Sequence, residues 1–379
     1  MSLTQTILRS PAVAALTSPH GVDRFLEVVN PMWAVNEVRA EIVDVTRETD
    51  DVVTLTLRPS GAWQGFRAGQ NVLVGVEIAG ARRTRCFSIS SAEPADSSEP
   101  ADSSGPADSS GPNGAGSNTA DTFTITVRSH EEGLVSRYLA RTARPGLVLH
   151  LSQAEGTFIL PDPLPERLLM ISGGSGITPV MSMLRTLMRD GYEGDITFVH
   201  YSQSAEQTIF ASELTALAGR DNLDLHVVHT RDGGERFSPG RLRLIAPDFA
   251  GTDTFACGPA GLVEQVQQTY DAAGAEDRLR VEYFKTSTIS PNPEDATGSV
   301  RFTGADRQTE NTGGTLLEQA EQLGLQPEYG CRMGICFTCT SRKREGTVRN
   351  VVTGASSSLP DEDIQICVST PVGDCAVDL

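Results

Sequence analysis

The sequence lacks any apolar run of about eighteen residues, the length that a transmembrane helix requires. Basic residues are also in deficit: 31 Lys and Arg stand against 49 Asp and Glu, which leaves a formal net charge of −18. This deficit argues against nucleic-acid binding and against direct insertion into or adsorption on an anionic membrane. It suits a partner protein with a basic surface.

Cysteine is scarce too, with seven in 379 residues. Three of them, Cys86, Cys257 and Cys375, suggest no disulfide framework, so a reducing environment is expected. The first residues contain one early arginine and a short apolar stretch next to proline, which is a poor match to a signal peptide. We therefore expect a soluble, cytoplasmic protein, peripheral to a membrane only through its partner.

The other four cysteines form a motif. Cys331, Cys336, Cys339 and Cys367 are separated by four, two and twenty-seven residues. This is the spacing of a plant-type [2Fe–2S] ferredoxin, in which four thiolates hold two irons. Four thiolates also suit structural zinc, but zinc sites usually pair two Cys-x(2–4)-Cys knuckles, whereas Cys367 stands alone. The spacing therefore favours the iron–sulfur cluster, whose closed coordination shell moves electrons and binds no substrate.

Upstream, residues 1–35 are expected to be an extension with some helical character, followed by a first folded domain over 36–160. Short runs of β-forming residues bounded by Gly and Pro predict an antiparallel β-barrel. The predicted strands are 38–45, 52–57, 71–78, 84–90, 123–127 and 147–151. Between the fourth and fifth lies an insert, 93–120, that carries Pro-Ala-Asp-Ser-Ser three times and is expected to be disordered because it has few apolar residues.

Strands and helices then alternate over 161–285, which predicts a doubly wound parallel sheet with helices on both faces. The predicted strands are 167–172, 195–201, 223–229, 253–257 and 280–284, and the predicted helices are 178–189, 211–218 and 260–273. A linker at 286–297 follows, because two prolines and few apolar residues occur there. Residues 298–379 complete a small α+β ferredoxin domain, with strands near 299–303 and 348–351 and a helix at 316–323.

Two stretches in the barrel have the chemistry to hold a flavin. Arg85 can meet a pyrophosphate with its planar guanidinium, Phe87 can stack on an aromatic ring system, and the Ser88 hydroxyl can hydrogen-bond a flavin edge. Downstream, Gly133 precedes a predicted helix that begins near Ser136, and a helix N-terminus attracts phosphate. Each stretch alone also has an ordinary structural explanation: a plain strand and an N-cap serine.

Two further stretches end strands of the parallel sheet, where such sheets bind nucleotides. Gly173, Gly174 and Gly176 allow close approach of phosphate, and Thr178 and Pro179 open the next helix. The Gly-x-Gly-x-x-Gly fingerprint is absent because Pro179 occupies its last position, which disfavours an ordinary dehydrogenase. The tripeptide Cys257-Gly258-Pro259 ends a later strand, and its thiol is expected at the same crevice.

In this order and at these distances the motifs resemble the ferredoxin–NADP reductase superfamily, in particular its members with a C-terminal plant-type ferredoxin domain. The resemblance covers about residues 36–379. It implies that Arg85, Phe87, Ser88, Gly133 and Ser136 bind FAD. It further implies that Gly173, Gly174, Gly176 and Thr178 belong to the pyridine-nucleotide loop, with Thr178 beside the nicotinamide. By the same resemblance Cys257, which Gly258 and Pro259 follow, lies near the nicotinamide ring. Glu282 and Phe284 fall where the family often places an acidic residue and an aromatic residue near the flavin. Among these and the flavin residues, Ser88, Thr178, Cys257 and Phe284 are the expected catalytic positions.

The implied activity is NAD(P)H-dependent electron transfer through FAD and the [2Fe–2S] cluster to a one-electron acceptor protein. NADPH is slightly favoured over NADH, with Arg231 as the nearest cation for a 2′-phosphate. The stretches around Cys331–Thr340 and Gly346–Asn350 are similar to those of actinobacterial reductases that serve membrane acyl-CoA desaturases. A steroid or aromatic-ring oxygenase is the alternative acceptor, and a ferredoxin-like carrier with an inert flavin domain is the non-enzymatic alternative. Phe337 is either an acceptor contact or a shield for the cluster.

Overall fold

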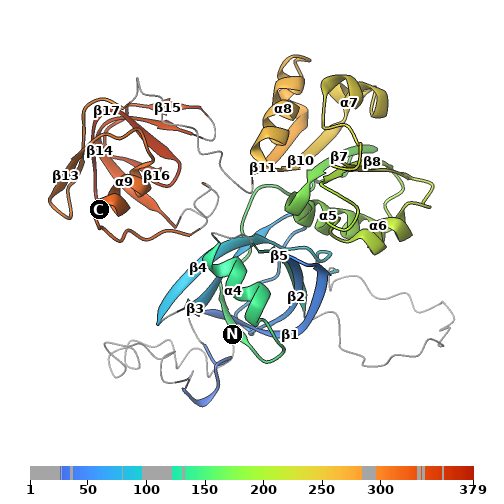
Figure 1. Ribbon diagram of the computed structural model, residues 1–379, viewed down its shortest axis with the longest axis horizontal. Helices are drawn as coiled ribbons and strands as arrows, with labels where there is room; N and C mark the ends of the chain where they lie inside the picture. Colours follow the sequence, from blue (N-terminus) through green and yellow to red (C-terminus); the bar gives the residue numbers. More distant parts are fainter. Residues whose placement is uncertain are drawn as a thin grey trace.

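The computed structural model describes most of the chain, namely residues 26, 28–34, 37–78, 80–95, 122–129, 133–283, 296–330, 334, 338–351 and 354–379. Several expectations therefore fall outside the described residues: most of the 1–35 extension and of the 286–297 linker, the repeats of the insert, Phe284, Cys331, Cys336 and Phe337. Three sheets make up the described part (Figure 1).

The first sheet is antiparallel and has the order β4-β3-β6-β1-β2-β5. Its strands are β1 (Val38–Thr49), β2 (Val52–Pro59), β3 (Asn71–Ile78), β4 (Ala81–Ser88), β5 (Phe123–Arg128) and β6 (Val148–Leu151). A bridge between Ile89 and Ile125 brings the β4 and β5 edges together, so the sheet curls into a barrel. Helix α4 (Leu134–Thr142) buries Val135 and Leu139 against the barrel core.

The second sheet is parallel and has the order β11-β10-β7-β8-β9. Its strands are β7 (Arg167–Gly173), β8 (Asp195–Ser202), β9 (Leu223–His229), β10 (Asp253–Gly258) and β11 (Leu279–Tyr283). Helices α5 (Ile177–Arg189) and α6 (Ala211–Leu217) cover one face, and α7 (Pro239–Ile245) and α8 (Ala260–Asp271) cover the other (Figure 1). Short 3₁₀ turns occur at Gly174–Gly176, Phe249–Gly251 and Glu276–Arg278.

Helix α5 joins the barrel to the parallel sheet. Its polar side donates from Ser182 Oγ to the Ser91 carbonyl (2.6 Å), and Thr186 Oγ1 accepts from the Glu93 backbone N–H (2.9 Å). Val52 and Ala68 of the barrel belong to the same apolar cluster as α5. Because these contacts are buried and specific, the two sheets have a defined geometry at their boundary.

The C-terminal sheet has the order β13-β12-β17-β14-β15, with β16 also paired to β14. Its elements are β12 (Ser299–Phe302), β13 (Arg307–Glu310), α9 (Leu316–Gln322), β14 (Thr340–Asn350), β15 (Ser356–Ser357), β16 (Glu362–Gln365) and β17 (Ser369–Val377). Thr315 and Glu318 form a capping box that starts α9. The strand predicted near 348–351 is wrong at its start, because β14 begins at Thr340. Its charged first half has no apolar alternation to reveal it.

The predicted fold class is confirmed: an antiparallel barrel, a doubly wound parallel sheet and an α+β ferredoxin-like domain. Strand β17 and helix α7 were not predicted from the sequence. Pro371 and Gly373 interrupt the β17 pattern, and α7 has a single buried residue, Leu242. No helix within the described residues is long and apolar enough to cross a membrane.

Candidate functional site

A buried polar cluster lies where the barrel meets the carboxyl edge of the parallel sheet. We call Asn71, Ser88, Cys257 and Glu282 the domain seam. Glu282 is 5% exposed and accepts long hydrogen bonds from Ser88 Oγ and Asn71 Nδ2, both at 3.4 Å. Cys257 and Glu282 are partners across the parallel pair β10–β11. Groups from two barrel strands and two sheet strands therefore converge on one carboxylate.

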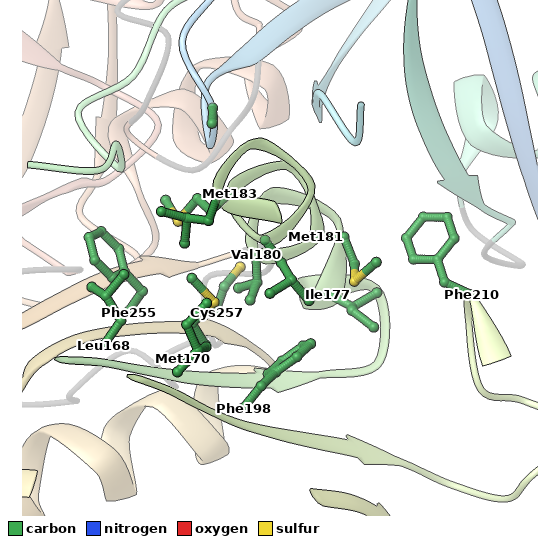
Figure 2. Close-up of a cluster of buried hydrophobic side chains, with 14 of the residues drawn as sticks. Leu168, Met170, Ile177, Val180, Met181, Met183, Phe198, Phe210, Phe255 and Cys257 are labelled. Carbon is green, nitrogen blue, oxygen red and sulfur yellow. The ribbon is translucent and has the colours of Figure 1, made fainter. Parts of the chain in front are cut away.

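The Cys257 side chain is fully buried, in the apolar cluster beneath α5 that Figure 2 shows. Burial, and secondarily the Glu282 carboxylate, raise the pKa of the Cys257 thiol well above its usual value. The thiol is therefore neutral at physiological pH and is not a thiolate nucleophile. A neutral, soft side chain at this position is suited to packing against a ring.

The predicted flavin strand is β4. Arg85 and Phe87 are half-buried, and Phe87 packs partly against the barrel core, whereas Ser88 is 4% exposed and belongs to the domain seam. Cys86, between them, donates its S–H to Asn71 Oδ1 (3.0 Å). Side chains along β4 thus alternate between its two faces, and those of Cys86 and Ser88 point toward the domain seam.

Helix α4 begins directly after Gly133, which has no side chain to cap the free N–H groups of the first turn. Ser136 Oγ donates back to the Gly133 carbonyl (3.3 Å), so the serine does not occupy those N–H groups. The first turn of α4 also contains no acidic residue. Such a helix start has the donors and the dipole to hold a phosphate, so it fits the flavin phosphates implied by the sequence.

The two glycine-containing loops of the parallel sheet pack on one another. A Cβ added to Gly176 would lie 2.3 Å from the Cys257 carbonyl oxygen, and one on Gly258 would lie 3.0 Å from the Gly173 nitrogen. Gly173 and Gly258 also approach Pro259 and each other closely. These glycines are therefore required by loop packing alone, whatever ligand binds beside them.

Gly174 is different. It has φ +54°, and a Cβ there would meet only the Arg128 Nη1 atom, at 3.1 Å. Arg128 ends barrel strand β5, pairs with Asp51 (3.0 Å) and so carries a cation across to the mouth of the sheet. Thr178 Oγ1 donates to the Ser175 carbonyl (3.1 Å), a hydrogen bond that links the start of α5 to the glycine loop. The loop thus has the guanidinium that a pyrophosphate requires.

A second buried pair lies at the ends of the two central strands. Ser172 Oγ and His200 Nδ1 are 2.7 Å apart, and both residues are inaccessible to solvent. Burial, with the nearby Arg128 and His229 as lesser causes, lowers the pKa of His200 to about 3. The imidazole is therefore neutral and fixes the strand edge that carries the glycine loop.

The described part of the cysteine motif is compact. Cys339 and Cys367 are 3% and 5% exposed, and the Ile366 N–H donates to the Cys339 carbonyl (3.2 Å). Gly334 has φ +74°, and a Cβ there would lie 3.0 Å from Val368. Gly334 and Cys339 therefore lie against the segment of Cys367, and the donor set of four cysteines in the sequence fits [2Fe–2S].

Asn71, Arg128 and His200 were not singled out from the sequence. Asn71 is a polar residue at the start of the apolar run of β3, and His200 follows the apolar Phe198 and Val199 of β8; this placement next to buried apolar residues is the signal that could have found them. Arg128 looks like an ordinary strand-ending cation until its reach to Gly174 is seen.

Two family models match the chain. The model described as an oxidoreductase NAD-binding domain matches residues 170–268, and the model for a 2Fe-2S iron-sulfur cluster binding domain matches residues 300–372. The first covers most of the parallel sheet, and the second covers most of the C-terminal sheet.

Known proteins agree with this division. The chain is 35% identical over 369 residues to an "NADPH oxidoreductase" of Mycobacterium tuberculosis, covering 97% of this chain and 90% of the relative. It is 29% identical to a "Glycine betaine monooxygenase reductase subunit" of Pseudomonas aeruginosa, covering 93% and 98%. The solved structure of a phthalate dioxygenase reductase has the same fold, with a TM-score of 0.59 at 19% identity over 91% of this chain and 98% of that one. The chain therefore belongs to the NAD(P)H-dependent flavin and [2Fe–2S] oxidoreductases of the ferredoxin–NADP reductase superfamily.

Proposed function

We propose that electrons from NAD(P)H enter at the domain seam and leave one at a time, through the cysteine motif, to an acceptor protein. The convergence of Ser88, Cys257 and Glu282 carries this proposal, because it joins the predicted flavin strand to the predicted nicotinamide loop. We assign residues 36–160 to flavin, 161–285 to nucleotide and 298–379 to the cluster. The FAD, when bound, supplies the conversion between a two-electron nicotinamide donor and a one-electron cluster.

The flavin residues proposed are Arg85, Phe87, Ser88, Gly133 and Ser136. The free N–H groups at the start of α4 support FAD over a smaller flavin, because they offer a second phosphate-binding position besides Arg85. A cavity of about 690 Å³ lies farther along the same helix and is lined by the cations Arg47, Arg137 and Arg141 and by the anions Asp50 and Asp51.

The nicotinamide residues proposed are Thr178 and Cys257, with the glycine loops and Pro259 beneath them, and Phe284 is proposed near the flavin. Arg128 and Gly174 would hold the pyrophosphate of NAD(P)H, since the guanidinium lies at the outer side of the loop. Cys257 would pack against the ring as a neutral thiol, and Ser88 and Glu282 would keep the ring facing the flavin strand. Alignment, rather than acid–base chemistry, is then the main contribution of the protein.

We propose Arg231 as the determinant of NADPH preference. Its backbone N–H donates to the Gln203 carbonyl (2.8 Å), which places it beside the end of β8, and its side chain is exposed. Arg231→Gln should raise KM for NADPH about tenfold and leave KM for NADH unchanged, because the lost charge–phosphate bond exists only for NADPH. Arg236→Gln, a nearby exposed arginine, is the matched control. Equal changes for both nucleotides would refute the assignment.

The acceptor proposed is an oxygen-using enzyme that consumes single electrons. The names of the relatives support an oxygenase, and the stretches around the cysteine motif support a membrane acyl-CoA desaturase. A reconstitution with a soluble hydroxylase and a membrane desaturase, each with NADH and NADPH, separates the two. Product formation with only one acceptor decides between them.

The simplest test of the reductase itself is anaerobic addition of NADPH or NADH to purified protein. We expect the flavin absorbance to bleach with either or both nucleotides. Unchanged absorbance with both would favour the ferredoxin-like carrier.

A further inference from the structure

Lys343 is an unusual cation in this chain. The sequence contains only two lysines, Lys285 and Lys343, among 31 Lys and Arg residues. Arginine is thus the basic residue at almost every position, whereas Lys343 lies on β14 with 0% exposure. Lysines are almost never fully buried unless they are paired, because desolvating the charge is costly.

The Lys343 ammonium is held inside the domain by three oxygens. Nζ donates to the Gly346 carbonyl (3.0 Å) and to the Leu359 carbonyl, and it lies 3.7 Å from Glu362 Oε2. The Glu362 side chain is 32% exposed, so water screens this anion more than it screens the cation. The result is a cation fixed in a protein interior beside a partly solvated partner.

This pair lies on the same ladder as two cysteines of the motif. Strands β14 and β16 pair from Lys343–Glu362 at one end to Thr340–Gln365 at the other. Cys339 directly precedes Thr340, and Cys367 follows Gln365 by two residues. Lys343 lies four residue steps along the chain from Cys339, a Cα distance of about 13 Å. At this distance a buried charge still acts on a redox centre, because the interior screens weakly.

We propose that Lys343 sets the reduction potential of the iron–sulfur cluster. The inference rests on the proposed function, which places the cluster on the four cysteines. One-electron reduction adds one negative charge to a centre held by four thiolates, and no proton is required. The Lys343 cation stabilises this added charge and thereby raises the potential, whereas Glu362 opposes it. Lys343 thus changes the reduction potential through its charge alone, without contacting the cluster.

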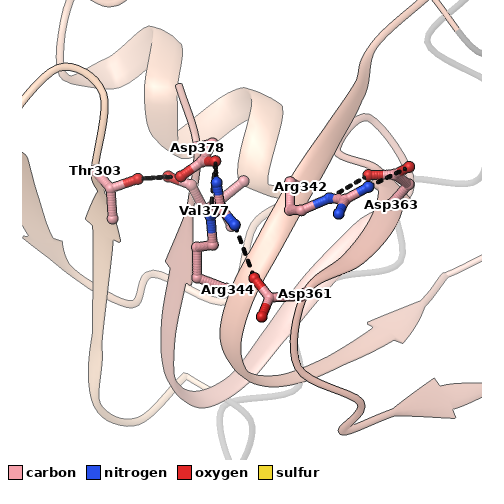
Figure 3. A network of polar contacts seen from close by, with 7 residues as sticks. All are labelled: Thr303, Arg342, Arg344, Asp361, Asp363, Val377 and Asp378. Carbon is pink, nitrogen blue, oxygen red and sulfur yellow. Dashed lines mark hydrogen bonds and ion pairs between the residues drawn. The ribbon is translucent and has the colours of Figure 1, made fainter.

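The matched control is Arg342, on the same strand. Arg342 is one residue nearer to Cys339 but points outward, with a 43% exposed side chain in a bidentate pair with Asp363 at 2.7 and 2.9 Å (Figure 3). If distance alone mattered, removing Arg342 would shift the potential more. If burial matters, removing Lys343 will shift it more.

The experiment is a redox titration of the full-length holoprotein, followed by the electron paramagnetic resonance of the reduced cluster. At a fixed poise we expect Lys343→Met to lower the ratio of reduced to oxidised cluster about two- to fivefold, or about 20 to 40 mV. Glu362→Gln should shift the ratio in the opposite direction, and Arg342→Met should leave it within error.

The outcomes separate the two proposals. A wild-type protein without a cluster signal would overturn the proposed function. A wild-type signal with an unchanged potential in both Lys343→Met and Glu362→Gln would overturn the role of Lys343. If Lys343→Met fails to retain the cluster, Glu362→Gln decides, because its partly exposed site tolerates the change: an upward shift supports the proposal, and none or a downward shift refutes it.

Discussion

The parallel sheet and the C-terminal sheet bury different kinds of polar group. In the parallel sheet His200 and Cys257 are neutral, since burial lowers the pKa of the first to about 3 and raises that of the second. In the C-terminal sheet the buried group is the Lys343 ammonium, and arginines on the same strand carry ion pairs at the surface (Figure 3). The proposed electron entry thus combines two neutral titratable groups with the buried Glu282 carboxylate, whereas the proposed exit has a fully buried cation nearby.

This difference matches what each end must do. The proposed entry site must align a flat nicotinamide ring at a set distance, and close-packed buried groups achieve this. The exit site changes its charge by one unit on each transfer, so nearby fixed charges directly change its energy. Each prediction below removes one side of this contrast.

Cys339→Ser should have the largest effect, because it removes a ligand of the iron–sulfur cluster and leaves the proposed flavin and nicotinamide site intact. We expect loss of the cluster and no detectable reduction of an acceptor protein, while NAD(P)H reduction of ferricyanide through the flavin persists. Iron content and both activities are measured on the same preparation. The control is Cys375→Ser, a buried thiol of the same domain outside the motif, which should keep the cluster. Loss of ferricyanide reduction in Cys339→Ser would contradict the separation of the two ends.

Glu282→Gln should slow reduction of the flavin by NAD(P)H and leave the iron–sulfur cluster unchanged. Ser88 and Asn71 each donate to a different oxygen of Glu282, so the amide keeps only one of the two acceptors and the barrel loses one of these hydrogen bonds to the sheet. Since misalignment by about 1 Å can cost 10²-fold, we expect kcat for ferricyanide reduction to fall about 10- to 100-fold. Stopped-flow bleaching of the flavin by NADPH measures this step. Exposed Glu276→Gln is the control, and an unaltered cluster potential confirms that the exit is intact.

His200→Gln tests whether the entry domain depends on a neutral imidazole. The folded pKa of about 3 lies below the usual 6.5, so only the unfolded chain takes up this proton between these values. Stability from this group is therefore present above pH 6.5 and is lost as pH falls, by about 2 kcal/mol between pH 7 and 5. Urea unfolding should show that the variant lacks this component of the pH dependence. His226→Gln, at a half-exposed site, should retain it.

Much of this site could be predicted from the sequence because its signals are local. The cysteine spacing, the Arg85–Ser88 strand and the two glycine loops each lie within a few residues, and strand alternation identifies their elements. The contacts of Asn71 and Arg128 could not be predicted, because each depends on a partner more than forty positions away in the chain. The burial of Lys343 was not predicted either, because the polar run Ser-Arg-Lys-Arg-Glu has no apolar alternation that would show which of its cations points inward.

Arg344→Gln should have the smallest effect, although Arg344 has more ion-pair partners than Lys343. Its side chain is 46% exposed and donates to Asp378 (2.7 Å) and Asp361 (2.8 Å) (Figure 3). Solvent and salt screen such pairs, so we expect the thermal midpoint to fall by less than about 3 °C and the difference to shrink in high salt. Arg344 and then Thr303 hold the pKa of Asp378 below its usual value, so the small contribution is present above about pH 4 and is lost at lower pH. Calorimetry at two salt concentrations and at pH 7 and 3 measures this. A fall of the thermal midpoint by much more than about 3 °C, or one that persists in high salt, would contradict the view that this surface pair contributes little to the stability of the C-terminal domain.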